Sequence, residues 1–352
     1  MPPKVNHGAG ACPLPHTGTE TVLLGHGSGG RLSEELLREV FLPAFKNPYL
    51  EKLNDQAIVP AAGESLAFTT DSFVVDPLFF PGGDIGSLAI HGTVNDLAVG
   101  GARPLYLSAA FILEEGLPMA HLKTIVASMQ AACLASGVAL VTGDTKVVDR
   151  GKGDGVFITT SGVGALKKNR AISVERARPG DKILLSGSIG DHGIAILSVR
   201  EGIEFETRLT SDSAPLVSPI GRVLAVSDHV HCLRDPTRGG VSSTLNEIAR
   251  ASGVGIEIDE GRIPIHPEVR GACELLGLDP LYVANEGKFI AVVAAEDADR
   301  ALEALMGDPL GRSAALIGEV VEDNPGRVVL RSRIGGRRVV QMLAGEQLPR
   351  IC

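Results

Sequence analysis

The chain has 352 residues, which is enough for about two domains of ordinary size. Hydrophobic residues make up 44% of the chain and charged residues 21%, as in ordinary globular proteins, so wholesale disorder is excluded. The net charge is −9, aromatic residues reach only 4%, and tryptophan is absent. These values disfavour a nucleic-acid-binding protein, because such proteins need basic surfaces or stacking aromatic side chains.

Neither a membrane span nor a secretory signal is expected. No stretch approaches 18 uninterrupted apolar residues, and the first twenty residues lack the apolar core of a signal peptide. The five cysteines are scattered without a Cys-x-x-Cys pair, which favours a reducing compartment over a disulfide framework. We therefore expect a cytoplasmic protein with no membrane or nucleic-acid partner.

The first part of the chain predicts a flexible lead-in and then one domain. Residues 1–20 are rich in Pro, Gly and His, and a glycine-rich loop at residues 25–30 follows. Leu32, Leu36 and Val40 recur at helical spacing after this loop. The remaining elements expected in the first domain, residues 21–168, are strands at 66–70, 105–113, 138–142 and 156–163 and helices at 86–99 and 117–136.

A turn at residues 178–181 introduces the second predicted domain, residues 169–334. Its expected elements are strands at 182–186, 255–258, 288–294, 314–320 and 327–331 and helices at 190–199, 239–251 and 297–306. Strands and helices do not alternate strictly, which favours an α+β fold over a doubly wound sheet. Residues 335–352 are expected to form a flexible tail.

Five aspartates stand at turns or at the ends of apolar runs; they are Asp55, Asp71, Asp96, Asp144 and Asp235. Mg²⁺–nucleotide sites need several carboxylates together with phosphate oxygens, so this set is typical of a metal–phosphate site. The same residues are also common helix caps and turn residues, and the pattern leaves both interpretations open. The loop at 25–30 lacks the features of a Walker or Rossmann motif, although its backbone N–H groups could hold an anion.

Several strings resemble those of the ATP-binding superfamily that includes aminoimidazole ribonucleotide synthetase, selenophosphate synthetase and thiamine-monophosphate kinase. Within it, the chain looks most similar to the carbamoyl dehydratases of hydrogenase maturation. The strings are His26–Gly30, Thr70–Asp84, His91–Ala98, Thr142–Val148, Arg234–Gly240, Ala284–Gly287 and Pro349–Cys352. Together they cover almost the whole chain after about residue 20.

The resemblance implies a two-domain synthetase-like fold, in which the N-terminal domain dimerises through its sheet into a barrel and the C-terminal domain is α/β. ATP would lie between the domains with Mg²⁺ at its phosphates. By motif position, the implied magnesium ligands are Asp55, Asp71, Asp96 and Asp235. The residues implied to hold the nucleotide are Gly27, Ser28, Gly29, Gly30 and Asp144.

The resemblance also implies the chemistry. Cys352 would receive a carbamoyl group from the carbamoyltransferase HypF, and ATP-dependent dehydration would convert the thiocarbamate to a thiocyanate. The cyano group would pass to iron on the HypC–HypD complex, for the [NiFe] hydrogenase centre. In this reaction the amide oxygen leaves as phosphate and the nitrogen loses its protons. Removal of the protons calls for a general base. Glu286 is the candidate base, and Lys146 would steady the developing anion or relay a proton; an ordinary salt bridge is the alternative.

The terminal thiol has room to move between sites. Seventeen residues follow Gly335, and fully extended they span at most roughly 55–60 Å. The sequence leaves open whether the tail rests inside or outside the site. Cys133, Cys232 and Cys273 are expected to pack in the core, and the histidines show no metal-binding spacing.

Two other functions are weighed against the dehydratase. One is the phosphorylation of selenide or a small molecule, which is disfavoured because the glycine-rich loop contains no cysteine. The other is a thiol carrier for iron-site assembly that does not turn over ATP. The set of aspartates disfavours it, because a pure carrier would not need them.

Overall fold

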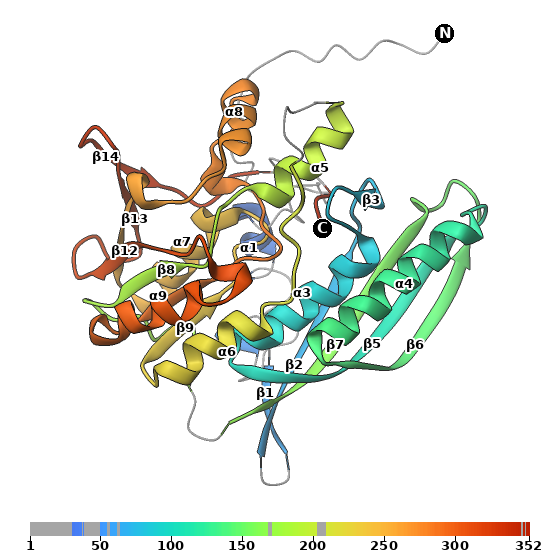
Figure 1. Ribbon diagram of the computed structural model, residues 1–352, viewed down its shortest axis with the longest axis horizontal. Helices are drawn as coiled ribbons and strands as arrows, with labels where there is room; N and C mark the ends of the chain where they lie inside the picture. Colours follow the sequence, from blue (N-terminus) through green and yellow to red (C-terminus); the bar gives the residue numbers. More distant parts are fainter. Residues whose placement is uncertain are drawn as a thin grey trace.

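In its described residues, the computed structural model contains two large sheets, each covered by helices, which lie side by side, and a third sheet of two short strands (Figure 1). The structure describes residues 30–36, 38, 50–54, 57–61, 64–167, 171–202, 209–345, 348 and 350–352. Among the described residues, no helix combines the length and apolar character that crossing a membrane requires.

The first sheet has five strands in the order β1-β2-β7-β5-β6. Neighbouring strands run antiparallel except β5 and β6, which are parallel. The strands are β1 (Ala57–Ala61), β2 (Glu64–Phe73), β5 (Ala102–Glu114), β6 (Ala139–Val148) and β7 (Val156–Leu166). The helices α3 (Ile85–Val99) and α4 (Met119–Ser136) lie on one face, beside the short β3 (Phe79–Phe80) and β4 (Gly83–Asp84). Before the sheet come helix α1 (Arg31–Leu36) and the 3-10 turn η3 (Leu50–Lys52).

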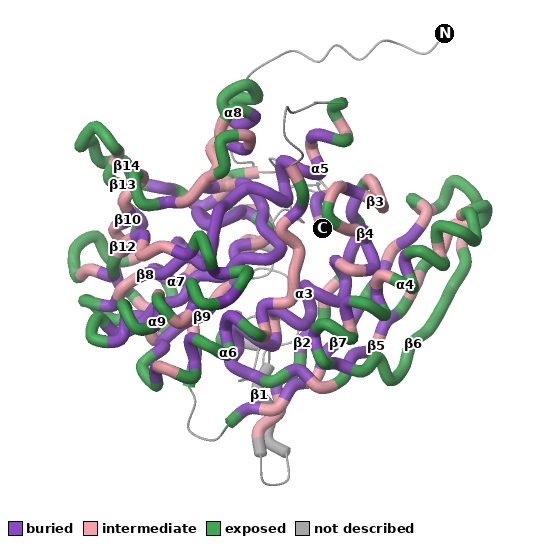
Figure 2. The backbone as a smooth tube through the Cα atoms, viewed as in Figure 1, coloured by how far each residue is buried: buried purple, intermediate pink, exposed green. Residues whose placement is uncertain are grey.

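The alternation of side chains along β5 separates the two faces of this sheet. Leu107 and Ala109 are buried and belong to the core that α3 and α4 cover. Tyr106 and Ile112 point to the other face, and they are 51% and 44% exposed. The first sheet therefore has a packed inner face and an open, partly apolar outer face (Figure 2).

The second sheet has seven strands in the order β14-β13-β10-β12-β8-β11-β9. They are β8 (Lys182–Leu185), β9 (Val230–Arg234), β10 (Gly255–Asp259), β11 (Ile290–Val293), β12 (Ala315–Val321), β13 (Val328–Arg331) and β14 (Arg337–Val340). The helices are α5 (Asp191–Glu201), α6 (Val217–Val226), α7 (Gly240–Ser252), α8 (Pro267–Leu276) and α9 (Ala298–Met306). The 3-10 turns are η4 (Glu260–Arg262), η5 (Pro280–Tyr282), η6 (Ala295–Asp297) and η7 (Pro309–Gly311).

The α+β content and most of the elements expected from the sequence are confirmed. Helices α6 and α8 were not predicted, because α6 contains Pro219 and Gly221 and α8 begins with Pro267. Strand β14 lies within the residues expected to be tail, where it pairs antiparallel with β13. The tail therefore begins after Val340 and not at Gly335. Barrel formation by the first sheet stays a prediction.

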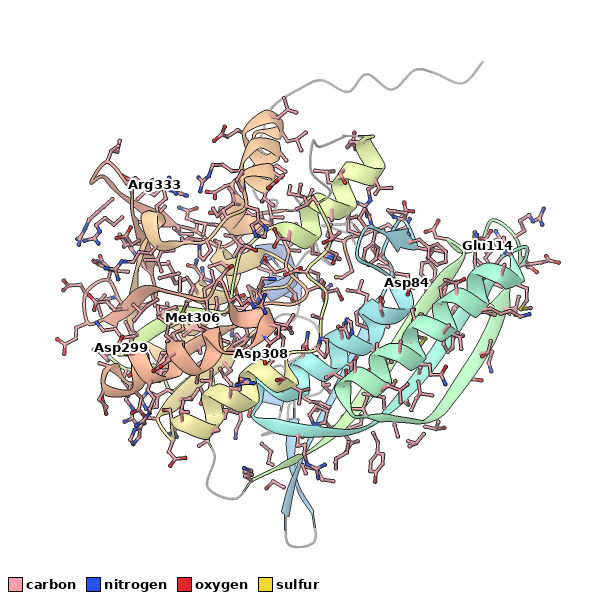
Figure 3. All side chains as sticks on the ribbon, viewed as in Figure 1. Asp84, Glu114, Asp299, Met306, Asp308 and Arg333 are labelled. Carbon is pink, nitrogen blue, oxygen red and sulfur yellow. The ribbon has the colours of Figure 1, made fainter. Side chains whose placement is uncertain are left out.

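Helix α3 carries site residues, and its first turn is fixed by Asp84. The Asp84 carboxylate accepts hydrogen bonds from the backbone N–H groups of Gly86 at 2.7 Å and Ser87 at 3.0 Å. Ser128 of α4 donates its hydroxyl to the same oxygen at 2.5 Å. Figure 3 shows Asp84 at this end of the helix. One carboxylate thus caps α3 and ties it to α4.

Replacing this cap should destabilise the protein. We expect Asp84→Ala to lower the free energy of unfolding by about 1–2 kcal/mol, since a lost N-cap costs that much. Asp84→Asn keeps a capping oxygen and serves as the control, with a smaller loss. Urea titration followed by circular dichroism measures both, and an Ala variant as stable as the wild type would contradict the role of the cap.

Candidate active site

The chain ends inside the molecule, against the end of β2. The backbone N–H of Val74 donates to the carbonyl of Cys352 at 3.0 Å, and that of Asp76 donates to Arg350 at 3.2 Å. The two hydrogen bonds join residues two apart on each segment in opposite chain directions, as in an antiparallel pairing, and they fix the last residues to the first domain. Ile351 is only 4% exposed and packs in the core of that domain. The tail therefore rests inside, which the sequence left open (Figure 1).

The Cys352 thiol lies among charged groups from both halves of the chain. Burial raises its pKa to about 12; the Arg238 guanidinium opposes this rise, and Glu286 and Asp71 add to it. Arg238 lies in the turn that begins α7, where Gly239 and Gly240 take positive φ angles of 76° and 60°. The docked thiol is therefore protonated near neutral pH and is a weak nucleophile in this position.

Glu286 is buried beside this thiol. Burial is the main cause that raises the pKa of Glu286 well above its usual value, and Asp71, Asp212 and Asp235 raise it further against Arg238. Its Oε1 atom has no hydrogen-bond partner among the described residues. A buried carboxyl group of raised pKa is the type of group that serves as a general acid or base.

The neighbours of Glu286 fix its backbone. Asn285 accepts the N–H of Gly190 at 2.8 Å and donates to the Pro236 carbonyl at 2.9 Å. At Gly287 a Cβ atom would lie 1.7 Å from the Asp212 carbonyl oxygen, so no larger residue fits without a shift. The strings Arg234–Gly240 and Ala284–Gly287 are thereby held together.

Asp212 also holds the backbone of Glu286 in place. Its carboxylate accepts the backbone N–H of Glu286 at 3.1 Å and pairs with the buried Lys288 ammonium at 3.0 Å. Asn95 of α3 donates to the Glu286 carbonyl at 3.2 Å and accepts the Leu216 N–H at 2.8 Å. The position of Glu286 is thus set by groups from both domains.

Three predicted aspartates join this cluster. Asp71 is on the inner face of β2, next to Gly92 of α3, where an added Cβ atom would be in ordinary contact with its Oδ2 at 3.5 Å and too close to the Phe73 ring at 2.9 Å. Asp96 of α3 accepts the Thr69 hydroxyl at 2.8 Å. Asp71 and Asp96 both raise the pKa of Arg238, and the buried Asp235 raises that of Glu286. The predicted Asp55 lies outside the described residues.

This carboxylate set fits a nucleotide-bound magnesium ion better than a resident metal. Among the described residues, no three His, Cys, Asp or Glu side chains are grouped to hold an ion by themselves. Mg²⁺ usually takes one or two carboxylates and fills its octahedron with phosphate oxygens and water. Asp71, Asp96 and Asp235 supply hard oxygen atoms of this kind.

Asp144 and Lys146 are not brought to Cys352 within the same chain. They pair across strands with Ala110 and Ile112, which places them on the open outer face of the sheet. Asp71 pairs with Thr160 on the inner face. Lys146 and Asp144 form an ion pair at 2.8 Å, and their side chains are 71% and 64% exposed. The sheet itself separates them from the buried cluster.

The glycine-rich loop contributes one described residue. Gly27, Ser28 and Gly29 lie outside the described residues. Gly30 is buried, and a Cβ atom on it would lie 2.3 Å from the Leu343 carbonyl oxygen, which accepts the Arg31 N–H at 2.8 Å. In this structure Gly30 therefore allows close contact with the first residues of the tail.

Several residues of the site were not predicted. Arg238 stands in the string Arg234–Gly240, and an arginine among so many carboxylates could have marked it as their counter-charge. Asn95 stands beside Asp96 in a helical string, where a polar residue in an apolar run was a usable signal. Asp212 precedes Glu286 by more than seventy residues in a loop, and no local pattern indicates their contact.

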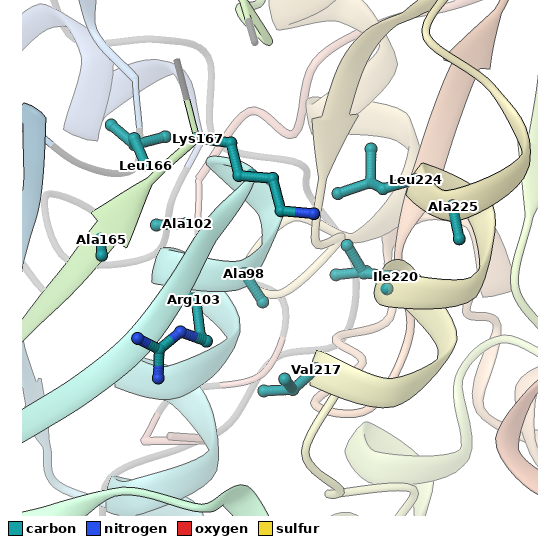
Figure 4. Close-up of a pocket in the computed structure, with 12 residues that line it drawn as sticks. Ala98, Ala102, Arg103, Ala165, Leu166, Lys167, Val217, Ile220, Leu224 and Ala225 are labelled. Carbon is teal, nitrogen blue, oxygen red and sulfur yellow. The ribbon is translucent and has the colours of Figure 1, made fainter. Parts of the chain in front are cut away.

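A separate hollow lies between the end of α3, β5 and α6 (Figure 4). It has a volume of 590 Å³, and its lining includes Ile220 and Leu224, with Arg103 and Lys167 as its charged residues. None of the residues of the Cys352 cluster lines it. Its lining contains no Asp, Glu, His or Cys, so it offers neither a carboxylate for a metal nor a thiol, and we place the chemistry at the cluster.

The raised pKa of Glu286 makes the stability of the protein depend on pH. A carboxyl whose pKa is higher in the folded state loses stability as pH rises from its unfolded value through its folded value. In chelator and without nucleotide, the free energy of unfolding of wild type should therefore fall relative to Glu286→Gln between pH 4.5 and 8. Chemical denaturation at several pH values measures this difference. Glu303→Gln, at an exposed position of α9, should show no such trend, and a constant difference for Glu286→Gln would contradict the raised pKa.

Comparison with known proteins agrees with this arrangement. The family described as AIR synthase related protein matches with its N-terminal domain at residues 53–166 and its C-terminal domain at residues 178–331. "Carbamoyl dehydratase HypE" of Cupriavidus necator is 59% identical over 330 residues, covering 94% of each chain. The protein of the same name from Escherichia coli is 50% identical over 336 residues, covering 94% of this chain and 99% of the relative.

Solved structures agree as well. The chain resembles HypE in a HypE–HypF complex with a TM-score of 0.84 and 47% identity, covering 88% of this chain and 99% of the other. It resembles HypE in complex with ATP with a TM-score of 0.80 and 51% identity, covering 94% of this chain and 100% of the other. The chain therefore belongs to the AIR synthase related family and, within it, to the carbamoyl dehydratase enzymes named HypE, as the sequence strings had implied.

Proposed function

We propose that this chain uses ATP to dehydrate a carbamoyl group carried on its own Cys352, giving a thiocyanate for hydrogenase maturation. The observation that carries the proposal is the position of the terminal thiol, which is half-buried beside the buried Glu286 and the aspartates of both domains. A carrier without catalysis would not need a buried base next to its thiol.

The site around Cys352 accepts the neutral S-carbamoyl form of this residue more readily than its thiolate form. Desolvation penalises a thiolate and leaves a neutral S-carbamoyl group unaffected by charge. The reactive thiolate therefore forms more readily when the tail is out of the cleft, and the neutral adduct is the species that returns. Loading outside and dehydration inside follow from the same environment.

The reaction balances as follows. The carbamoyl oxygen attacks the γ-phosphorus of ATP, ADP leaves, and the nitrogen loses one proton to give an O-phosphorylated thioimidate, in which one nitrogen and the sulfur remain on the carbon. The C–O bond then breaks with phosphate as leaving group while the second nitrogen proton departs, leaving the nitrile on sulfur. Glu286 accepts protons in turn and returns them to solvent. Arg238 stabilises the negative charge that develops beside the sulfur-bound carbon.

The nucleotide and its metal would lie at the aspartates. A solved HypE of 51% identity binds ATP, which supports ATP as the cosubstrate here. Asp71, Asp96 and Asp235, with the predicted Asp55, would hold Mg²⁺, and the ion would neutralise phosphate charge during transfer. Gly27, Ser28, Gly29 and Gly30 remain the proposed nucleotide loop.

We also propose HypF as the partner that loads Cys352, which the HypE–HypF complex of 47% identity supports. A HypC–HypD complex is proposed to receive the cyano group. Reversible docking of the tail suits both encounters, because neither partner has to enter the cleft.

Lys146 and Asp144 have a role in this proposal only if two copies of the chain associate. They share the open face of the first sheet with Tyr106 and Ile112, and an exposed apolar face of this kind is typical of an interface. We propose a homodimer through this face, in which these residues serve the site of the partner copy. In that arrangement Lys146 would steady the phosphate leaving group across the interface.

The chemical steps should separate in three variants. Cys352→Ala should take up no carbamoyl group, since its acceptor sulfur is gone. Glu286→Gln should be carbamoylated normally and then form the nitrile about 10²–10⁴ times more slowly, the usual cost of a lost general base. Asp235→Asn should load but hydrolyse almost no ATP. Mass spectrometry of the C-terminal peptide, which loses one water on dehydration, gives the readout.

Each variant has an outcome that would overturn its assignment. Normal nitrile formation in Glu286→Gln would remove the base. Carbamoylation of another cysteine in Cys352→Ala would move the acceptor, and wild-type ATP hydrolysis in Asp235→Asn would remove that metal ligand.

Mixed dimers test the placement of Lys146. Dimers of Lys146→Ala alone or of Cys352→Ala alone should both be nearly inactive. A mixed dimer contains one complete site if Lys146 acts across the interface, so it should regain about half of the wild-type activity. An inactive mixed dimer would show that Lys146 acts in its own chain, and full activity of Lys146→Ala would remove it from the mechanism.

A further inference from the structure

We propose that His192 and Arg200 of helix α5 are positioning residues that clamp the backbone of the tail, and so set how often Cys352 leaves the cleft. The proposal deepens the proposed function, because it concerns the regulation of the same thiol. It rests on contacts of the docked tail that neither the base nor the aspartates make.

His192 holds the peptide group next to the reactive residue. Its Nε2 atom lies 2.7 Å from the Ile351 carbonyl oxygen, and its Nδ1 lies 2.8 Å from the Ser211 hydroxyl. A carbonyl oxygen only accepts hydrogen bonds, so Nε2 must carry the hydrogen. The ring is fully buried and meets Phe80 edge-on at 5.6 Å. The donor therefore points at the tail and has no freedom to turn away.

Arg200 lies eight residues further along the same helix, on the same side. Its guanidinium donates to the carbonyl oxygens of Asp76 and Arg350, one on each strand of the tail pairing. A single planar group thus bridges the tail and the segment that the tail pairs with. Together, His192 and Arg200 bind two successive carbonyls immediately before Cys352.

The tail contributes its own side chains to the docking. The Arg350 guanidinium donates to the Val74 carbonyl at 3.1 Å and pairs with Asp154 at 3.0 Å. Ile351 fills a pocket in the core of the first domain. Arg350 and Ile351 therefore make the docking specific for this tail, whereas His192 and Arg200 recognise only its backbone.

One feature of the docked state opposes this clamp. Arg350 has a φ angle of +51°, in the left-handed region that residues other than glycine rarely adopt. Such a conformation persists only where surrounding contacts enforce it. The clamp is the set of contacts that does so here. The equilibrium between docked and released tail then depends on the strain at Arg350 and on the contacts of the clamp. Weakening the clamp should release the tail without altering the chemistry of the cleft.

The test measures how fast iodoacetamide alkylates Cys352 in the full chain, without ATP or carbamoyl donor, by mass spectrometry of the C-terminal peptide. Loss of a buried hydrogen bond shifts such an equilibrium by about 10-fold. His192→Ala and Arg200→Ala should therefore alkylate at Cys352 about 10 times faster than wild type. Arg200→Lys, which keeps one donor, should fall between. Buried Cys232 and Cys273 serve as internal references for the integrity of the fold.

Two further variants keep the result interpretable. Arg300→Ala, on α9 and paired with Asp297, removes an arginine far from the tail contacts and should leave the rate unchanged. Asp154→Asn, at an exposed position, removes the shorter of the two Arg350 ion pairs and leaves the one with Asp76 at 3.9 Å, so it should speed alkylation by a smaller factor. Wild-type alkylation rates in His192→Ala, Arg200→Ala and Asp154→Asn, with melting temperatures preserved, would overturn the clamp. Because the assay requires no ATP or nitrile chemistry, its failure would leave the proposed function standing.

Discussion

The buried carboxyl of Glu286 is the constraint on which the rest of the site depends. An acidic group with three neighbouring aspartates and an unpartnered oxygen is costly to bury, and its pKa rises in response. The surrounding contacts hold it there: Asn285 binds two separate loops, Gly287 permits the close approach of Asp212, and Lys288 offsets the Asp212 charge. Loss of Lys288 alone would leave a buried carboxylate without its counter-charge, so this ion pair positions the site and does not merely stabilise the fold.

The same environment favours the neutral forms of Cys352 over the thiolate. A neutral thiol or a neutral thiocarbamate can lie beside Glu286 and Asp71, whereas a thiolate cannot do so without penalty. Among the described residues, the Arg238 guanidinium lowers the pKa of the Cys352 thiol and so favours the anion, and Arg238 also interacts with Asp71, Asp96 and Glu286. Its attraction is thus shared among several carboxylates. Cations that arrive with a nucleotide would relieve this competition, which links the filling of the nucleotide site to the electrostatics at the sulfur.

Much of the fold could be predicted from the sequence, because periodic apolar runs mark strands such as β5 and helices such as α3. Helices α6 and α8 contain proline in their interior or at their start, and proline there indicates a turn or loop and not a helix. Strand β14 lies in a short arginine-rich segment without an apolar run that would indicate a strand. For the site, the resemblance of short strings located Glu286, Asp71, Asp96, Asp235 and Cys352. The contacts of Asp212 with Glu286 and of His192 with Ile351 join residues far apart in the chain, and no local pattern encodes them.

The position of Lys146 is not explained by a single copy of the chain. Its motif groups it with the other site residues, yet side chains on a strand alternate between faces, and the register of β5 with β6 puts Lys146 opposite to Asp71. The pairing contains an irregularity between Leu107 and Ser108, and beyond it Ala110 and Ile112 lie opposite Asp144 and Lys146. Side chains of paired residues share a face, so this pairing puts Lys146 on the outer face with Ile112. The motif and the register agree only if the chemistry of one chain is completed by the outer face of another. Under the proposed homodimer, the open apolar face, the exposed ion pair on β6 and the half-buried thiol would belong to one assembly, and the reaction would require two copies of the chain.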